Sequence, residues 1–84
     1  MDERLKKVLT AVLGRDLSDV EDPSAMNLEE WDSLKQMAIV AAVEDEFEVR
    51  FDEELIIHLN SFTALKRALE DPGYWPFLQH NHQP

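Results

Sequence analysis

The segment from Asp2 to Leu13 carries the clearest folding signal in the chain, an apolar stripe at helical spacing. Its members recur at intervals of three and four residues, which places their side chains on one face of an α-helix. They are Leu5, Val8, Leu9, Val12 and Leu13. Asp2 is expected to cap the start of this helix, and Gly14 suits its end. Strand signals are weak, because only residues 48–51 alternate. The stripe therefore needs other helices to cover it.

A second helix is predicted from Ser33 to Phe47, with Asp32 as its N-cap. A short third helix is expected to open at the acidic residues 52–54 and to end near His58. Each of these segments is bounded by polar residues, as helices in small domains commonly are.

A fourth helix is predicted to begin at a cap made by Asn60 or Ser61 and to stop at Asp71-Pro72-Gly73. Its apolar side consists of Phe62, Leu65, Ala68 and Leu69. A chain of 84 residues makes one domain with a small core. The sequence predicts an all-α bundle of three main helices and one short helix, spanning residues 1–72 and followed by a tail at 73–84.

A long polar loop, from about Arg15 to Trp31, separates the first two helices. Loops of this length are uncommon in compact domains unless they are functional or packed down. Its scattered apolar residues are expected to hold it across the bundle. They are Leu17, Val20, Met26 and Leu28, and Trp31 is expected to pack beside them.

The charge balance restricts the class of partner. Eighteen acidic residues against eight basic ones give a formal net charge of −10. This argues against nucleic acid, whose binding needs Lys and Arg, and disfavours anionic membranes. Proteins with basic patches are the expected partners, although the charge could also serve solubility alone. The chain has no cysteine, which is compatible with the cytoplasm, and no secretory signal is visible. The longest apolar run, Met37–Val43, is too short to span a bilayer.

Ser33 is the candidate functional residue. It falls in the first turn of the second helix, where free backbone N–H groups and the helix dipole favour an anion. A phosphoester on its hydroxyl would be stabilised there, so covalent modification is the preferred interpretation, and an ordinary serine near a cap is the alternative. An enzymatic nucleophile is disfavoured, because the glycines of a nucleophile elbow are missing and the histidines, His58, His80 and His82, offer no evident base.

The second helix carries two apolar strips. The bulky one contains Ile39, Val40, Val43 and Phe47; the milder one contains Leu34, Ala38 and Ala41 beside Asp45, with Met37 between the two strips. Two interpretations remain open. Either the helix is buried nearly all round, or the mild strip is an exposed docking surface that ends in the acidic residues Glu44, Asp45, Glu46 and Glu48.

The tripeptide Asp32-Ser33-Leu34, followed by an apolar helix ending in Glu44-Asp45-Glu46-Phe47, resembles the acyl carrier protein family. The resemblance extends from the first helix to Leu69. It implies a four-helix bundle in which Ser33 receives 4′-phosphopantetheine from coenzyme A, and the thiol of that arm carries acyl groups as thioesters. Asp32 and Leu34 would belong to the motif that the phosphopantetheinyl transferase reads.

The resemblance also assigns roles to other residues. It implies acidic partner-recognition positions at Glu44 and Asp45 on the second helix and at Glu53 and Glu54 on the third. With the mild strip of Leu34, Met37, Ala38 and Ala41, these residues make one expected partner-binding surface. It implies an acyl-chain pocket near Val40, Val43, Phe47, Leu59 and Leu65. The partners would be the transferase and acyl-loading, synthase or transferase enzymes with basic docking patches, and the carrier would be a monomer without catalytic activity of its own.

Several residues depart from carriers of bulk fatty-acid synthesis. They are Glu30-Trp31 before the motif, Lys35 and Gln36 after it, and Ala38 at an acidic recognition position. The Trp-Asp-Ser-Leu variant is similar to stand-alone carriers of specialised pathways, with an acyl or aminoacyl cargo. The alternative is a carrier-like interaction module that is never modified.

No metal site is predicted. Residues 16–27 resemble a calcium loop, but Glu21 replaces the required glycine and Asn27 the bidentate glutamate. His80 and His82 have metal-like spacing without an evident third ligand, and non-specific divalent binding by carboxylates remains open. Trp75 and Phe77 in the tail are expected to cover the end of the bundle or to act as a docking peptide.

Overall fold

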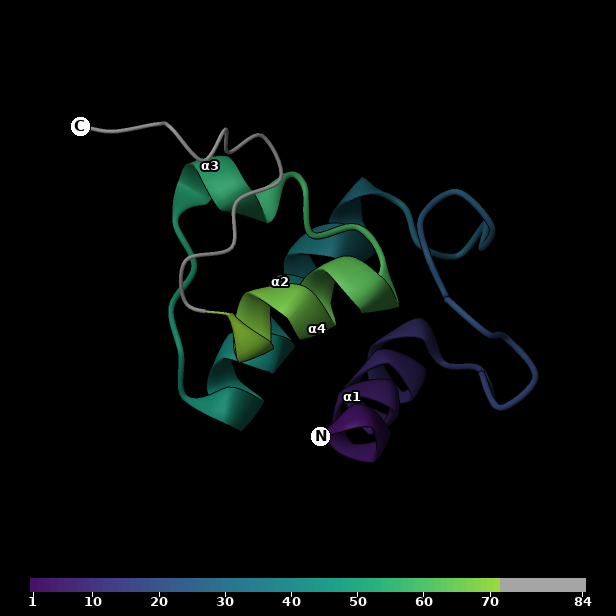
Figure 1. The fold of residues 1–84 in the computed structure, drawn as a ribbon. Coiled ribbons are helices and arrows are strands. Elements are labelled where there is room, and N and C mark those ends of the chain that lie inside the picture. The colour runs from purple at the N-terminus through teal and green to yellow at the C-terminus, as the bar shows by residue number, and fades with distance from the viewer. Residues whose placement is uncertain (72–84) are drawn as a thin grey trace.

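The computed structural model describes residues 1–71 and contains the four helices that the sequence predicts (Figure 1). They are α1 (Asp2–Leu13), α2 (Ser33–Phe47), α3 (Glu53–Ile56) and α4 (Phe62–Glu70). Within this part of the chain there is no strand, only an isolated bridge between Ser24 and Ser61. The predicted all-α bundle with a long loop between its first two helices is confirmed.

The sequence predicts the carboxyl-terminal end of α1 correctly but not its amino-terminal cap. Gly14 takes the left-handed conformation, with φ 69°, and its N–H donates to the Thr10 carbonyl, as expected of a glycine C-cap. The predicted cap by Asp2 is wrong, because Met1 is the N-cap and no side chain caps this end. Asp2 is instead the first helical residue, where its carboxylate still interacts favourably with the helix dipole.

The other helix starts are fixed by short polar side chains. Asp32 caps α2 by accepting a hydrogen bond from the Lys35 N–H at 2.9 Å. Ser61, and not Asn60, caps α4, accepting from the Ala64 N–H at 3.0 Å. The third helix is shorter than predicted, because its regular part ends at Ile56 and a turn follows.

The core is built from all four helices and the loop. Its buried apolar residues are Leu5, Leu9, Leu13, Leu17, Leu28, Trp31, Ile39, Val40, Val43, Leu55, Leu59 and Leu65. The first three form the α1 stripe, and Val8 and Val12 of that stripe pack against the cluster from its edge. Deeply buried side chains of this kind supply the main stabilisation of a small domain.

The loop is held down as predicted, with one exception. Leu17, Leu28 and Trp31 are buried, and Val20 packs against them. The expectation for Met26 is wrong, since its side chain is 92% exposed. Met26 lies in a tight turn where the Ser24 hydroxyl accepts from the Met26 N–H at 3.2 Å, and this turn projects away from the core.

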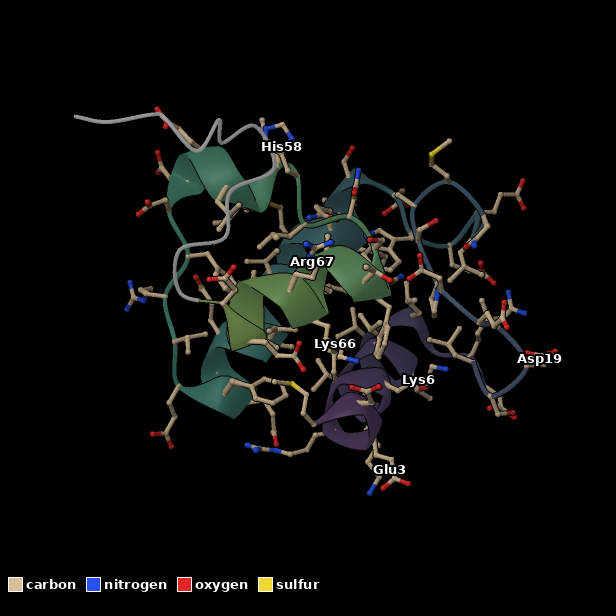
Figure 2. The ribbon with its side chains drawn as sticks, viewed as in Figure 1. Glu3, Lys6, Asp19, His58, Lys66 and Arg67 are labelled. Atoms are coloured by element: carbon tan, nitrogen blue, oxygen red, sulfur yellow. The ribbon has the colours of Figure 1, made fainter. Side chains whose placement is uncertain are left out.

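Hydrogen bonds join the loop to the start of α4. The Phe62 N–H donates to the Pro23 carbonyl at 2.8 Å, and Asp22 accepts from both the backbone N–H and the hydroxyl of Thr63. Lys66 of α4 lies toward α1 (Figure 2), and its Nζ pairs with the Asp2 carboxylate at 3.2 Å. The loop and α1 are thereby both fixed against α4.

The carboxyl-terminal end of α2 is fixed against α1. Arg4 pairs with Glu46 at 2.9 Å and lies 4.5 Å from the centre of the Phe47 ring. Among residues 1–71, no helix is long and apolar enough to cross a membrane. The predictions for Pro72, Gly73, Trp75, Phe77, His80 and His82, and for the tail as a separate unit, lie outside the described residues.

Candidate functional site

Ser33 is the first residue of α2, and its side chain is exposed. The Asp32 cap fixes the backbone on its amino-terminal side, and no acidic residue lies in the first turn of the helix. The positive end of a helix of 15 residues therefore lies beside the hydroxyl. This is the environment that the sequence predicts for Ser33, and it favours a phosphoester there.

A surface hollow of about 550 Å³ opens beside Ser33. It is lined by Ala25, Trp31, Asp32, Ser33, Gln36, Met37, Ile57 and Asn60. These residues come from the loop, the first turns of α2 and the segment after α3. The sequence predicted no site role for four of these residues, Ala25, Gln36, Ile57 and Asn60. Of the four, only Gln36 carried a signal in the sequence, because it lies one helical turn beyond Ser33.

The side chain of Gln36 connects three parts of the structure at the base of this hollow. Its Nε2 donates to the Ile56 carbonyl at 3.0 Å and to the Leu59 carbonyl at 2.9 Å. Its Oε1 accepts from the Trp31 indole N–H at 2.7 Å. These three bonds, which we call the Gln36 bridge, tie the end of the long loop and the start of α2 to the end of α3 and the segment that follows it.

The mild apolar strip of α2 is exposed. Leu34 is 81% exposed and Met37 59% exposed, and Ala38 and Ala41 also face solvent. The alternative in which α2 is buried nearly all round is therefore wrong. Ile57, 67% exposed, lines the same hollow as Met37 and adds to the apolar surface near Ser33.

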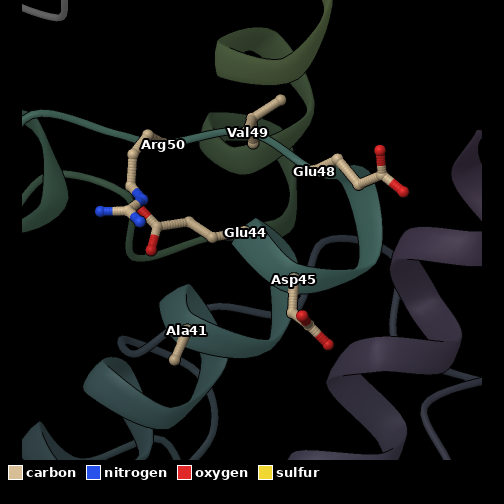
Figure 3. Close-up of a pocket in the computed structure, with 6 residues that line it drawn as sticks. All are labelled: Ala41, Glu44, Asp45, Glu48, Val49 and Arg50. Carbon is tan, nitrogen blue, oxygen red and sulfur yellow. The ribbon is translucent and has the colours of Figure 1, made fainter.

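The acidic residues at the far end of α2 differ in their surroundings (Figure 3). Asp45 is exposed, as are Glu53 and Glu54 on α3. Glu44 is half-buried, and its Oε2 accepts from the Phe51 N–H at 2.7 Å. This hydrogen bond fixes the chain after α2. The sequence did not predict such a structural role for Glu44.

Four of the five residues predicted to lie near an acyl chain are buried in the core. They are Val40, Val43, Leu59 and Leu65, while Phe47 is half-buried beneath Arg4. None of the five lines the hollow beside Ser33. The structure thus places them in the interior and separates them from the candidate attachment point. Within residues 1–71 no group of three or more His, Asp or Glu side chains is arranged to hold a metal ion.

A family model described as "Phosphopantetheine attachment site" matches residues 3–69. The chain belongs to this family of phosphopantetheine-binding domains. The resemblance to acyl carrier proteins is thereby confirmed at the level of the family, and so is the cofactor, because this family binds 4′-phosphopantetheine. Carrier domains of this type are not themselves catalytic and are recognised by transferases and other partner enzymes. A search of curated proteins finds no significant match to the chain.

The residues around Ser33 fit such a cofactor. An attached arm needs a hydroxyl that a transferase can reach, a neighbourhood that tolerates a phosphoester, and space for the arm to leave the surface. The exposed Ser33 side chain, the amino-terminal end of α2 and the open hollow meet these three needs.

Proposed function

We propose that Ser33 carries the 4′-phosphopantetheine arm and that the domain presents acyl or aminoacyl groups to partner enzymes. One observation carries this proposal: the exposed hydroxyl lies at the capped amino-terminal end of α2, inside the segment matched by the family model. The arm would supply a thiol on which acyl groups are held as thioesters.

The modification is a phosphoryl transfer. The Ser33 oxygen forms a new P–O bond to the phosphate next to the pantetheine, and the pyrophosphate bond of coenzyme A breaks with release of adenosine 3′,5′-bisphosphate. The hydroxyl proton passes to a base of the transferase. The protein contributes position and electrostatics. Asp32 holds the first turn of α2 in place through the Lys35 N–H, and the helix terminus stabilises the negative phosphodiester.

The exposed strip of α2 supports a proposed partner surface. It combines the apolar residues Leu34 and Met37 and the small residues Ala38 and Ala41 with the exposed carboxylate of Asp45. Glu53 and Glu54 extend the negative charge onto α3. A mild apolar centre with a charged margin suits brief contacts with several enzymes, since the charges accelerate encounter and the small anchor allows release.

Tethering makes such brief contacts sufficient. Once a partner has bound the domain, the arm presents the cargo at a high effective concentration, so the domain needs no catalytic group of its own. We further propose a monomeric carrier in the cytoplasm that serves a specialised pathway; the departures at Trp31, Lys35, Gln36 and Ala38 from bulk fatty-acid carriers support the last of these points.

The intact mass of the protein tests the proposal. Wild type and Ser33→Ala are incubated with coenzyme A, magnesium and a broad-specificity phosphopantetheinyl transferase. Wild type is expected to gain one phosphopantetheine and Ser33→Ala none, with both proteins folded by circular dichroism. A folded wild type that gains no mass would favour the alternative, an unmodified module that uses the same surface to bind a basic partner.

A further inference from the structure

One row of residues on α2 connects the attachment point with the interior. Ser33, Gln36, Val40, Val43 and Phe47 follow one another at intervals of three and four residues, so they share a face of the helix. Ser33 is exposed, whereas Val40 is 2% exposed and Val43 fully buried. Gln36 is the residue that separates the exposed end of this row from its buried part.

The hydrogen bonds of Gln36 are directed across this boundary. One donated bond goes to the carbonyl of Ile56, the last residue of α3, and the other to that of Leu59 beyond it, while the accepted bond comes from an indole that is 3% exposed. The partners also fix the orientation of the amide, because carbonyls can only accept and an indole N–H can only donate. The side chain therefore reaches from α2 to residues 56–59, and its amide nitrogen and its oxygen are both hydrogen-bonded.

Two members of this bridge, Trp31 and Gln36, line the hollow beside Ser33. The buried residues Val40 and Leu59 do not line it. A chain that entered the core alongside Gln36 would separate its amide from both carbonyls. The Leu59 carbonyl belongs to a residue with no exposed surface, so it would lose a partner that solvent does not readily replace.

We propose that the Gln36 bridge closes the path from Ser33 to the core and keeps the cargo on the outside of the helices. The inference rests on the proposed function, since it requires an arm on Ser33. It specifies the cargo class as acyl groups that gain little from burial, namely short or polar ones, aminoacyl groups included. The proposal also makes Gln36 a specificity-determining residue, because this side chain determines which acyl chains can be buried in the core.

A series of loaded proteins tests the closure. The transferase is supplied with acetyl-, hexanoyl- and decanoyl-coenzyme A, and intact mass first confirms that each acyl arm is attached. Failure at this step would refute the proposed function and not the closure. In wild type, the melting temperature and the NMR signals of the Trp31 indole N–H and the Val40 methyl groups are expected to be the same for all three chains.

Gln36→Ala removes the bridge, and Lys35→Ala is the matched control, because it shortens a neighbouring side chain in the same helical turn but leaves the bridge intact. In Gln36→Ala the melting temperature is expected to rise by at least about 5 °C from acetyl to decanoyl, with shifts at Val40, as methylenes become buried. In Lys35→Ala no such trend is expected. Gln36→Ser, which also lacks the bridge, provides a second variant with a short side chain if Gln36→Ala does not fold.

Two results would overturn the proposal. A chain-length trend in wild type, with shifts at Trp31 and Val40, would show that the path is open despite the bridge. The absence of a trend in the folded Gln36 variants would show that the core stays closed for reasons other than this side chain.

Discussion

Replacing Gln36 with Glu should destabilise the domain in a pH-dependent way. The two side chains have nearly the same shape, so the substitution changes chemistry and not packing. The oxygen that accepts from Trp31 is retained, but the nitrogen that donates to the Ile56 and Leu59 carbonyls becomes a second oxygen. Two attractive contacts at 3.0 and 2.9 Å thereby turn into repulsive ones.

The magnitude follows from these contacts. A hydrogen bond in a protein contributes about 1 kcal/mol net, so the two lost bonds cost about 2 kcal/mol. Partial burial of a carboxylate next to two carbonyl oxygens also destabilises the folded state, while the hydrogen bond from Trp31 becomes stronger. Together these two effects add about 1 kcal/mol to the loss of stability. At pH 7 we expect Gln36→Glu to lower the free energy of unfolding by about 3 kcal/mol, a large fraction of the ~5–15 kcal/mol typical of a native domain.

Protonation should reverse part of this loss. The protonated acid can donate to one of the two carbonyls, so the folded state favours it and raises the pKa of the new carboxyl above its value of about 4.3 in the unfolded chain. The folded state then binds more protons than the unfolded state between these two pKa values. Stability relative to wild type therefore increases as the pH falls through this window, by up to about 1.4 kcal/mol per pH unit, and levels off below about pH 4.

Urea unfolding followed by circular dichroism at several pH values measures the effect. Gln36→Met is the matched control, because it has a similar length, makes none of the three bonds and carries no charge. Its loss relative to wild type should be about 2–3 kcal/mol at every pH. Equal losses for the two variants across the pH range, or no loss in either, would refute the hydrogen-bond geometry assigned to Gln36.

Three further predictions address the cap, the partner surface and an exposed carboxylate. Asp32→Ala should lower the free energy of unfolding by about 1 kcal/mol, because the Lys35 N–H loses its acceptor, and Asp32→Asn should restore most of it; thermal melts measure both. Asp45→Lys should slow association with the transferase and flatten its salt dependence in stopped-flow measurements, and unchanged on-rates would exclude this part of α2 from the partner surface. A hydrogen bond from the backbone N–H of Ser18 lowers the pKa of Asp16. In an NMR titration the carboxyl carbon of Asp16 should therefore titrate below the usual range for aspartate. The stabilisation from this hydrogen bond should be lost as the pH falls through the lowered pKa.

The structure also changes how the partner surface should be tested. The proposed partner surface assigns Glu44 a recognition role, yet its carboxylate accepts a hydrogen bond from the Phe51 N–H. Reversing its charge would disturb the chain after α2 as well as any docking contact. Asp45 is the better probe, because it is exposed and, among residues 1–71, its carboxylate accepts no backbone hydrogen bond like that of Glu44.

Local patterns in the sequence were sufficient to predict the helices. The period of three and four in α1, the Asp32 cap of α2 and the left-handed Gly14 all depend on residues within one or two helical turns, and the structure agrees with each of them. The placement of Ser33 at the start of α2 depends on the same local rules. The candidate attachment point was therefore predictable from the sequence.

Contacts between distant segments were decided by the tertiary structure. Periodicity shows which residues of α2 share a face, but it does not show which faces the other helices cover, so only the fold revealed that Leu34 and Met37 are exposed. Gln36 is one polar residue among many in the sequence, and its partners lie 20 and 23 positions further along the chain. The sequence by itself determined the helices and the place of Ser33, whereas long-range packing decided what surrounds Ser33, because a hydrogen bond between distant segments depends on how the whole chain folds.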